Sequence, residues 1–193
     1  MCKIWAFEYL VYLCIDWYEN VSGRNDWETH FSTLSLLKLL FFASSIRNDE
    51  RFENPDLLDI FDNFYALPHG PVESDIYNGI NSTIPFFKSM GFEGGLNRFL
   101  ITSQKVELLQ TPASVDDIIS ELSDDTAARL KDSIKVLRSI NENLITYSAF
   151  ELVEISHKWS CWKDAYAVAT SLGVKAQSMP VESIKRSDRH FSV

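Results

Sequence analysis

His157 and Cys161 are the two side chains whose types and spacing could do chemistry together, because they lie four residues apart. On one continuous helix they would share a face, as a zinc ligand pair or as a Cys/His nucleophile pair. Zinc needs three or four ligands, and the other cysteines, Cys2 and Cys14, lie near the N-terminus. Ser160 is expected to break the helix between the pair, and no third residue is visible to orient the histidine. We therefore expect no metal, no cofactor and no catalytic residue, with His157 at a helix C-terminus and Cys161 packed as a small apolar side chain.

His69 is a second candidate, in the stretch FYALPHGPVESDIY from Phe64 to Tyr77. An aromatic run enters a His-Gly-Pro turn there, and an acidic run leaves it. A histidine in a turn could act as a general base, but the sequence fixes no partner acid beside it. We interpret His69 as a packed or solvent-edge histidine.

The Gly-Pro pair of the same stretch predicts the start of a helix. Gly70 is expected to be the N-cap, and Pro71 suits the first helical position, where its missing N–H costs nothing. This predicts a helix from Pro71 to about Ile80. The tetrapeptide PVES occurs again at Pro180, where another short helix is expected, and this favours helix-start chemistry at both places.

Apolar periodicity elsewhere indicates helices, with one small β element. We expect helices over Ile4–Tyr18, Thr33–Ser45, Val115–Leu122 and Thr126 to about Leu144, the last capped by Asp124 or Asp125. Two further helices are expected up to Gly173, the first opened by a Ser148–Glu151 capping box and the second by Ser160. Phe99–Thr102 and Val106–Leu109 are expected to form a hairpin, while Leu57–Tyr65 is ambiguous between helix and strand. The predicted fold is mainly α, a compact single domain over residues 1–193 with a small β-hairpin or short sheet.

Composition narrows the classes of function. The 193 residues are 46% hydrophobic, the formal net charge is −9 and the pI is about 4.9. An acidic chain lacks the basic face that wide nucleic-acid binding needs, so we expect no nucleic acid and instead a basic protein partner. No apolar run reaches the ~20 residues of a membrane span, so we expect no membrane association. Three cysteines form no disulfide framework, which predicts a cytoplasmic location.

Two surface features are candidate contacts for a partner. Six acids and no bases lie between Glu107 and Asp125, and this stretch includes Asp116 and Asp117. Trp159 and Trp162 flank the corner near Cys161; we expect Trp162 in the core and leave Trp159 open between core and surface.

Several stretches, in order, resemble the Panacea domain of antitoxins, a family that includes SocA-like proteins. They are LSLLKLLFFASSI, FYALPHGPVESDIY, SAFELVEISHKWSCWKDAY and MPVESIKRSDRHF. The positions that match the family's pattern are Lys38-Leu39-Leu40 with Phe41 and Phe42, Gly70-Pro71-Val72, Tyr77, Leu152, His157, Trp162-Lys163 and Phe191. The chain departs from the pattern at His69, where the family often has Tyr or Phe, and at Cys161, where it commonly has Pro. Residues 81–146 align with none of it, and we expect a family-variable insertion there that holds the hairpin and an amphipathic helix.

The resemblance implies a mostly helical fold and an antitoxin that binds and neutralises a cognate toxin. Two alternatives stay open: a proteolytic adaptor that delivers a toxin to a AAA+ protease, and a phage or mobile-element protein that blocks a host defence protein. A homodimer also stays open. The resemblance assigns structural roles to Lys38, Gly70, Pro71, Val72, Trp162 and Lys163. The candidate partner contacts are His69, Tyr77, Asp116, Asp117, His157 and Trp159.

Overall fold

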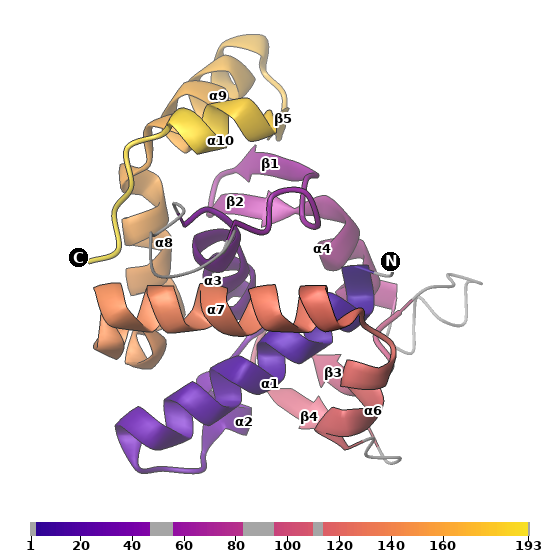
Figure 1. The fold of residues 1–193 in the computed structure, drawn as a ribbon. Helices are drawn as coiled ribbons and strands as arrows, with labels where there is room; N and C mark the ends of the chain where they lie inside the picture. Colours follow the sequence, from indigo (N-terminus) through magenta and orange to yellow (C-terminus); the bar gives the residue numbers. More distant parts are fainter. Residues whose placement is uncertain (1–2, 47–55, 83–94, 110–113, 193) are drawn as a thin grey trace.

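The computed structural model describes residues 3–46, 56–82, 95–109 and 114–192 (Figure 1). The helices are α1 (Lys3–Ser22), α2 (Trp27–His30), α3 (Thr33–Ser44), α4 (Ser74–Ser82), α6 (Val115–Ser120), α7 (Asp124–Ile140), the 3-10 helix η1 (Glu142–Thr146), α8 (Ala149–Lys158), α9 (Ser160–Leu172) and α10 (Val181–Arg186). The strands are β1 (Phe64–Leu67), β2 (Gly70–Glu73), β3 (Phe99–Ile101), β4 (Val106–Leu108) and β5 (Gln177–Ser178). The expectation of a mainly α fold with small β elements is confirmed.

Helix α3 is the centre of the core. Ten of its twelve residues, Ser35 to Ser44, are buried, as expected for a helix that is apolar nearly all round. It packs against α8, α7 and strand β2. An aromatic cluster covers its C-terminal half, where Phe41 meets Trp159 edge-on at a centroid distance of 4.8 Å and Phe64 at 5.5 Å.

Two small antiparallel sheets lie on this helical frame. In the first, the strand order is β2-β1-β5, so β1 pairs with the adjacent β2 and with β5 from near the C-terminus. The second is the β3–β4 hairpin, which confirms the pairing expected for Phe99–Thr102 and Val106–Leu109. The ambiguous segment Leu57–Tyr65 is a turn followed by the first two residues of β1.

Several helix boundaries follow the capping chemistry of the sequence. The Ser148–Glu151 capping box opens α8, and Gly173 ends α9 in the left-handed conformation, both as expected. The cap of α7 is a correction, because Ser123 accepts from the Thr126 N–H and the helix already begins at Asp124. That helix also ends at Ile140, and the remaining residues to Thr146 form η1.

A larger correction concerns Pro71. Residues 70–73 form strand β2, and α4 begins only at Ser74, so neither Gly70 nor Pro71 starts a helix. The Glu73 carboxylate accepts from the Ile76 N–H at 2.8 Å and caps α4. The second PVES does open a helix, with Pro180 as the N-cap of α10. The same four residues therefore adopt different structures at the two places.

Buried Glu8 connects the long N-terminal helix α1 to the residues before β3. Its side chain is fully buried and accepts from the N–H groups of Asn97 at 2.8 Å and Arg98 at 2.5 Å. Burial raises the pKa of this carboxyl, and these hydrogen bonds act in the opposite direction. No helix of the described residues is long and apolar enough to cross a membrane.

We expect Glu8→Ala to lower the free energy of unfolding by about 2–4 kcal/mol, because the backbone N–H groups of Asn97 and Arg98 lose their buried carboxylate acceptor. The matched control is Glu19→Ala, an exposed position on the same helix, where we expect a change within about 0.5 kcal/mol. Urea denaturation of both variants measures the difference. Equal stability of the two variants would show that Glu8 does not hold the β3 segment.

Candidate functional site

The turn of the β1–β2 hairpin packs on two core helices, α3 and α8. Gly70 opens β2 with φ of +92°, and a Cβ there would lie 2.3 Å from Ser156 Oγ and 2.9 Å from Lys38 Cε. Glycine is therefore required for two reasons: the left-handed conformation and the lack of room. This geometry supports the structural role expected for Gly70, which stays a prediction, and it places the residue in a hairpin.

Lys38 lies in this contact with no exposed surface. Its Nζ donates to the Pro71 carbonyl at 2.6 Å. Pro71 lies on β2, which is an outer strand of the sheet, and pairs with Ala66 of β1. At this position the backbone nitrogen and the carbonyl of β2 point away from β1. The missing N–H of proline costs nothing there, and Lys38 supplies the donor that a further strand would otherwise give. Burial lowers the pKa of Lys38 to about 7.

Three stacked rings stand against the other side of the hairpin. The His157 ring lies 3.8 Å from the Trp162 ring at an interplanar angle of 10°, and Tyr166 stacks on Trp162 at 4.9 Å. Trp162 donates through Nε1 to the Leu67 carbonyl at 3.0 Å, which ties α9 to β1. Burial lowers the pKa of His157, and the positive charge of Lys38 acts in the same direction.

A groove of about 540 Å³ opens beside the hairpin; we call it the hairpin groove. Its apolar walls are Leu34, Leu37, Leu67, Pro68, Val72 and Ile101. Its polar lining residues are Thr33, His69, Tyr77, Asn81, Thr102 and Ser103. These residues come from α3, from the β1–β2 hairpin with the adjoining α4, and from the β3–β4 hairpin, so three separate stretches of the sequence build one concave surface.

The structure divides the expected site residues into separate groups. His69, Val72 and Tyr77 meet at the hairpin groove. The contacts that hold the hairpin in place involve Lys38, Gly70, Pro71, His157 and Trp162. Lys163 is exposed and its side chain has no hydrogen bond or ion pair to another described residue, so the structural role expected for it stays a prediction.

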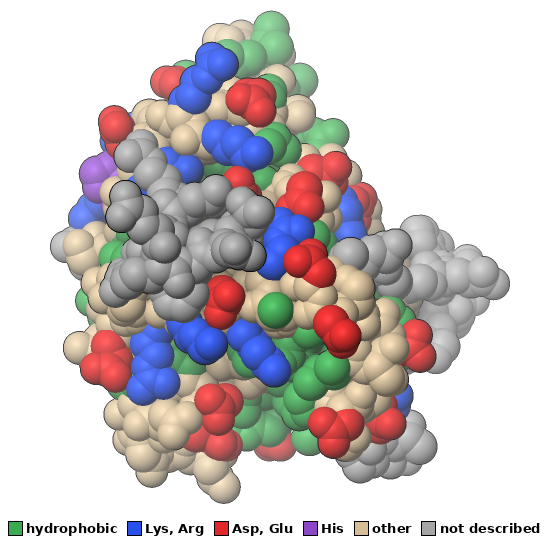
Figure 2. Space-filling view, in the orientation of Figure 1, with side chains coloured by type: hydrophobic (Ala, Val, Ile, Leu, Met, Phe, Trp, Pro, Cys, Tyr) green, Lys and Arg blue, Asp and Glu red, His purple; other side chains and the backbone are tan. Residues whose placement is uncertain are grey.

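Asp116 and Asp117 lie apart from the groove, on the short helix α6. Figure 2 shows Asp and Glu side chains at the end of the molecule where α6 lies. Both side chains are exposed, and Asp117 also takes part in the capping box with Ser114. They form a second, acidic candidate contact that does not line the groove.

Trp159 requires a correction, because its side chain is fully buried. It packs on Phe41 and Phe191 and donates through Nε1 to the His190 carbonyl at 2.9 Å. A tryptophan held inside the core has no surface for a partner, so we remove it from the candidate contacts. Trp162 is buried as expected, at 8% exposure.

His157 and Cys161 do not form a pair among the described residues. His157 stacks on Trp162, whereas Cys161 lines a different cleft between α9 and α10 and its backbone N–H donates to Ser187 Oγ. Burial raises the pKa of the Cys161 thiol, which disfavours the reactive thiolate. The break between α8 and α9 at Trp159 separates the two side chains.

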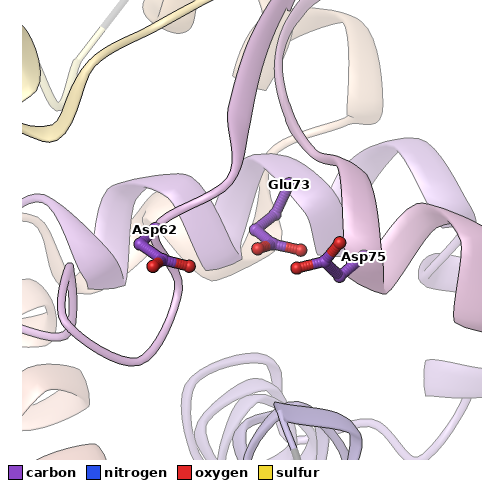
Figure 3. Close-up of side chains that lie close together, drawn as sticks. All are labelled: Asp62, Glu73 and Asp75. Carbon is purple, nitrogen blue, oxygen red and sulfur yellow. The ribbon is translucent and has the colours of Figure 1, made fainter.

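One cluster of acids was not foreseen from the sequence. The carboxylates of Asp62, Glu73 and Asp75 converge near the base of the hairpin (Figure 3). Lys3 Nζ contacts all three, at 2.6, 3.0 and 2.6 Å. This ammonium supplies the positive charge that the cluster needs, so we interpret it as an ion-pair network that ties α1 to the hairpin. The sequence separation of about 60 to 70 residues left no local signal for it.

The protein is a mainly α-helical scaffold in which the β1–β2 hairpin packs on the core helices α3 and α8; we call this contact the corner. Gly70-Pro71-Val72 opens the second strand of the hairpin. The family described as "Antitoxin SocA-like, Panacea domain" matches residues 36–163, which is 128 of the 193 residues. The chain therefore belongs to the SocA-like Panacea domain family. Neither the curated proteins nor the solved structures include a match.

We expect Gly70→Ala to lower the free energy of unfolding by about 3 kcal/mol or more, from backbone strain and the clash with Ser156. Gly23→Ala is the matched control, since Gly23 also has a positive φ of 66° but nothing within 4 Å of the added Cβ. It should cost about 1 kcal/mol from the left-handed backbone alone. Chemical denaturation measures both. If the two variants lose equal stability, the close approach at Gly70 is not what constrains the corner.

The buried amine predicts a pH dependence that Lys38→Met removes. Between pH 7 and pH 10.5 the unfolded chain holds the Lys38 proton and the folded chain releases it. Stability should therefore rise with pH in this window, by up to about 1.4 kcal/mol per pH unit. Cys14, whose pKa burial raises to about 12, is present in both proteins, so its effect cancels in their difference. We expect the stability of wild type minus that of Lys38→Met to increase from pH 7 to 10; parallel profiles would contradict the burial of Lys38.

Proposed function

We propose that this protein is an antitoxin that neutralises a cognate protein toxin by direct, stoichiometric binding. The observation that carries the proposal is the family match over residues 36–163, which supports a general antitoxin role and a protein toxin as partner. Among the residues that match the family's motifs, Lys38, Gly70 and Pro71 meet behind the hairpin, and Val72 and Tyr77 line the groove beside it. A protein that acts by binding needs such a rigid surface.

The charge of the chain indicates the electrostatic character of the toxin. A net charge of −9 favours encounter with a basic partner, and α6 presents Asp116 and Asp117 to solvent. We propose α6 as the surface that guides the toxin on approach, and His69 and Tyr77 as groups that contact it after docking. His157 remains a supporting residue in this proposal, because it is stacked behind the hairpin.

Co-expression tests the function directly. The gene beside the one for this chain should encode a product that arrests growth when expressed alone, and this chain should restore growth and co-purify with that product. Neutralisation by binding predicts that the half-life of the neighbouring product does not change. A half-life that shortens only when this chain is present would replace neutralisation by protease delivery. A neighbour that is harmless alone would remove the main support for an antitoxin.

The role of α6 has its own test. Because exposed charges act mainly on encounter, Asp116→Lys should slow association with the neighbouring product about 3-fold or more at low salt and lose most of this effect at high salt. Glu19→Lys makes the same charge change at an exposed position on α1 and serves as the control. Stopped-flow or surface plasmon resonance measures the association rates of both variants at low and at high salt. Equal slowing by both variants would indicate general electrostatics and no special role for α6.

A further inference from the structure

The described residues that line the hairpin groove carry no permanent charge. Among the residues that the structure describes, no Lys, Arg, Asp or Glu lines this groove. A charged group that entered would lose its water without meeting an opposite charge. The groove therefore selects an uncharged occupant, even though the protein as a whole is acidic.

The polar groups of the groove differ in whether their hydrogen bonds are already used. The Thr33 N–H donates to the Thr102 carbonyl at 2.8 Å, and Thr102 Oγ1 accepts from the Lys105 N–H, so these two residues hold the groove together. The side chains of His69, Tyr77 and Asn81 make no hydrogen bond to the described residues, and the same is true of Ser103. Their donors and acceptors are available to an occupant.

The walls are set before any occupant arrives. Leu34 and Leu37 belong to the core helix α3, and Val72 is 8% exposed on a strand that the Lys38 contact fixes in place. The groove volume of about 540 Å³ lies within the range of well-formed binding pockets. A surface that is already ordered loses little conformational entropy on binding.

We propose that the hairpin groove receives one aromatic side chain with a polar edge, a tryptophan or a tyrosine, from the toxin. The apolar body of such a ring packs against Leu37 and Val72, while its N–H or O–H reaches the free groups of His69, Tyr77 or Asn81. An aliphatic side chain would cover these groups and leave them without partners. Aromatic residues buried in a preformed pocket commonly dominate the energy of protein interfaces. This inference rests on the proposed function, since it names the anchor by which the toxin is held.

The first experiment needs no toxin. N-acetyl-L-tryptophanamide is titrated into the full ¹⁵N-labelled chain, and N-acetyl-L-lysinamide serves as the charged control. We expect the tryptophan compound to shift the amide signals of His69, Asn81 and Ser103 and to saturate in roughly the millimolar range. Ser103→Arg, which places a charge at the groove, should weaken this binding at least about 5-fold. The absence of shifts at the groove, or equal shifts with the lysine compound, would overturn the proposal.

The second experiment uses the neighbouring gene product. Ser103→Arg should raise the Kd for this product at least about 10-fold, as expected when a central anchor is displaced. Leu108→Arg is the matched control, because Leu108 is 41% exposed on the same β3–β4 hairpin and does not line the groove. Thermal denaturation of both variants confirms that they fold.

The outcomes separate this inference from the proposed function. If wild type binds the neighbouring product and Ser103→Arg binds it equally well, the groove proposal fails and the antitoxin proposal stands. If wild type does not bind the product at all, the antitoxin proposal fails, and with it the toxin as the source of the anchor. If Ser103→Arg instead changes the oligomeric state of the chain alone, measured by analytical ultracentrifugation, the groove holds a second copy and the proposal is wrong.

Discussion

The close approach of the hairpin turn to helices α3 and α8 is the constraint on which the rest of this corner depends. Gly70 leaves no space for a Cβ between itself and Ser156, and Pro71 directs its carbonyl to an amine buried in α3. An unpaired buried carbonyl costs about 1–3 kcal/mol, and a buried ammonium costs more unless it is hydrogen-bonded. The Lys38 amine and the backbone carbonyl of Pro71 are partners in this hydrogen bond, so loss of the amine leaves the carbonyl without its donor.

This contact also determines what surrounds the hairpin. With β2 fixed on α3, Val72 and Leu67 face the same space as Leu34 and Leu37, and a groove results. The base of the hairpin is held by the Lys3 network, and its far side by the Trp162 hydrogen bond to Leu67. Three independent attachments therefore hold one short hairpin, which explains how an element of eight strand residues and a two-residue turn can form a fixed wall.

Sequence periodicity was sufficient for most helices and insufficient for the hairpin. The apolar run of α3, the capping box of α8 and the glycine that ends α9 are local signals, and each predicted its element. The Gly-Pro pair by itself predicts a helix start, because both residues are common there. What decides its conformation is tertiary: β1 on one side and the Lys38 amine on the other. The sequence does not indicate that Lys38 is buried, since a single lysine in an apolar run usually lies at the surface.

The two walls of the groove differ in how freely they can change. Val72 and Leu67 belong to the hairpin, where a substitution disturbs the Gly70 and Lys38 contacts as well as the groove. The other wall is formed by Ile101, Thr102 and Ser103 of the β3–β4 hairpin, within the stretch 81–146 that lies outside the family motifs. None of these three takes part in the Lys38–Pro71 hydrogen bond. Ser103 is the exposed residue of the three, so a substitution there can reshape the groove and leave the Lys38–Pro71 hydrogen bond in place. A scaffold built in this way can keep one wall fixed while the other changes, and this division follows from where the buried amine lies.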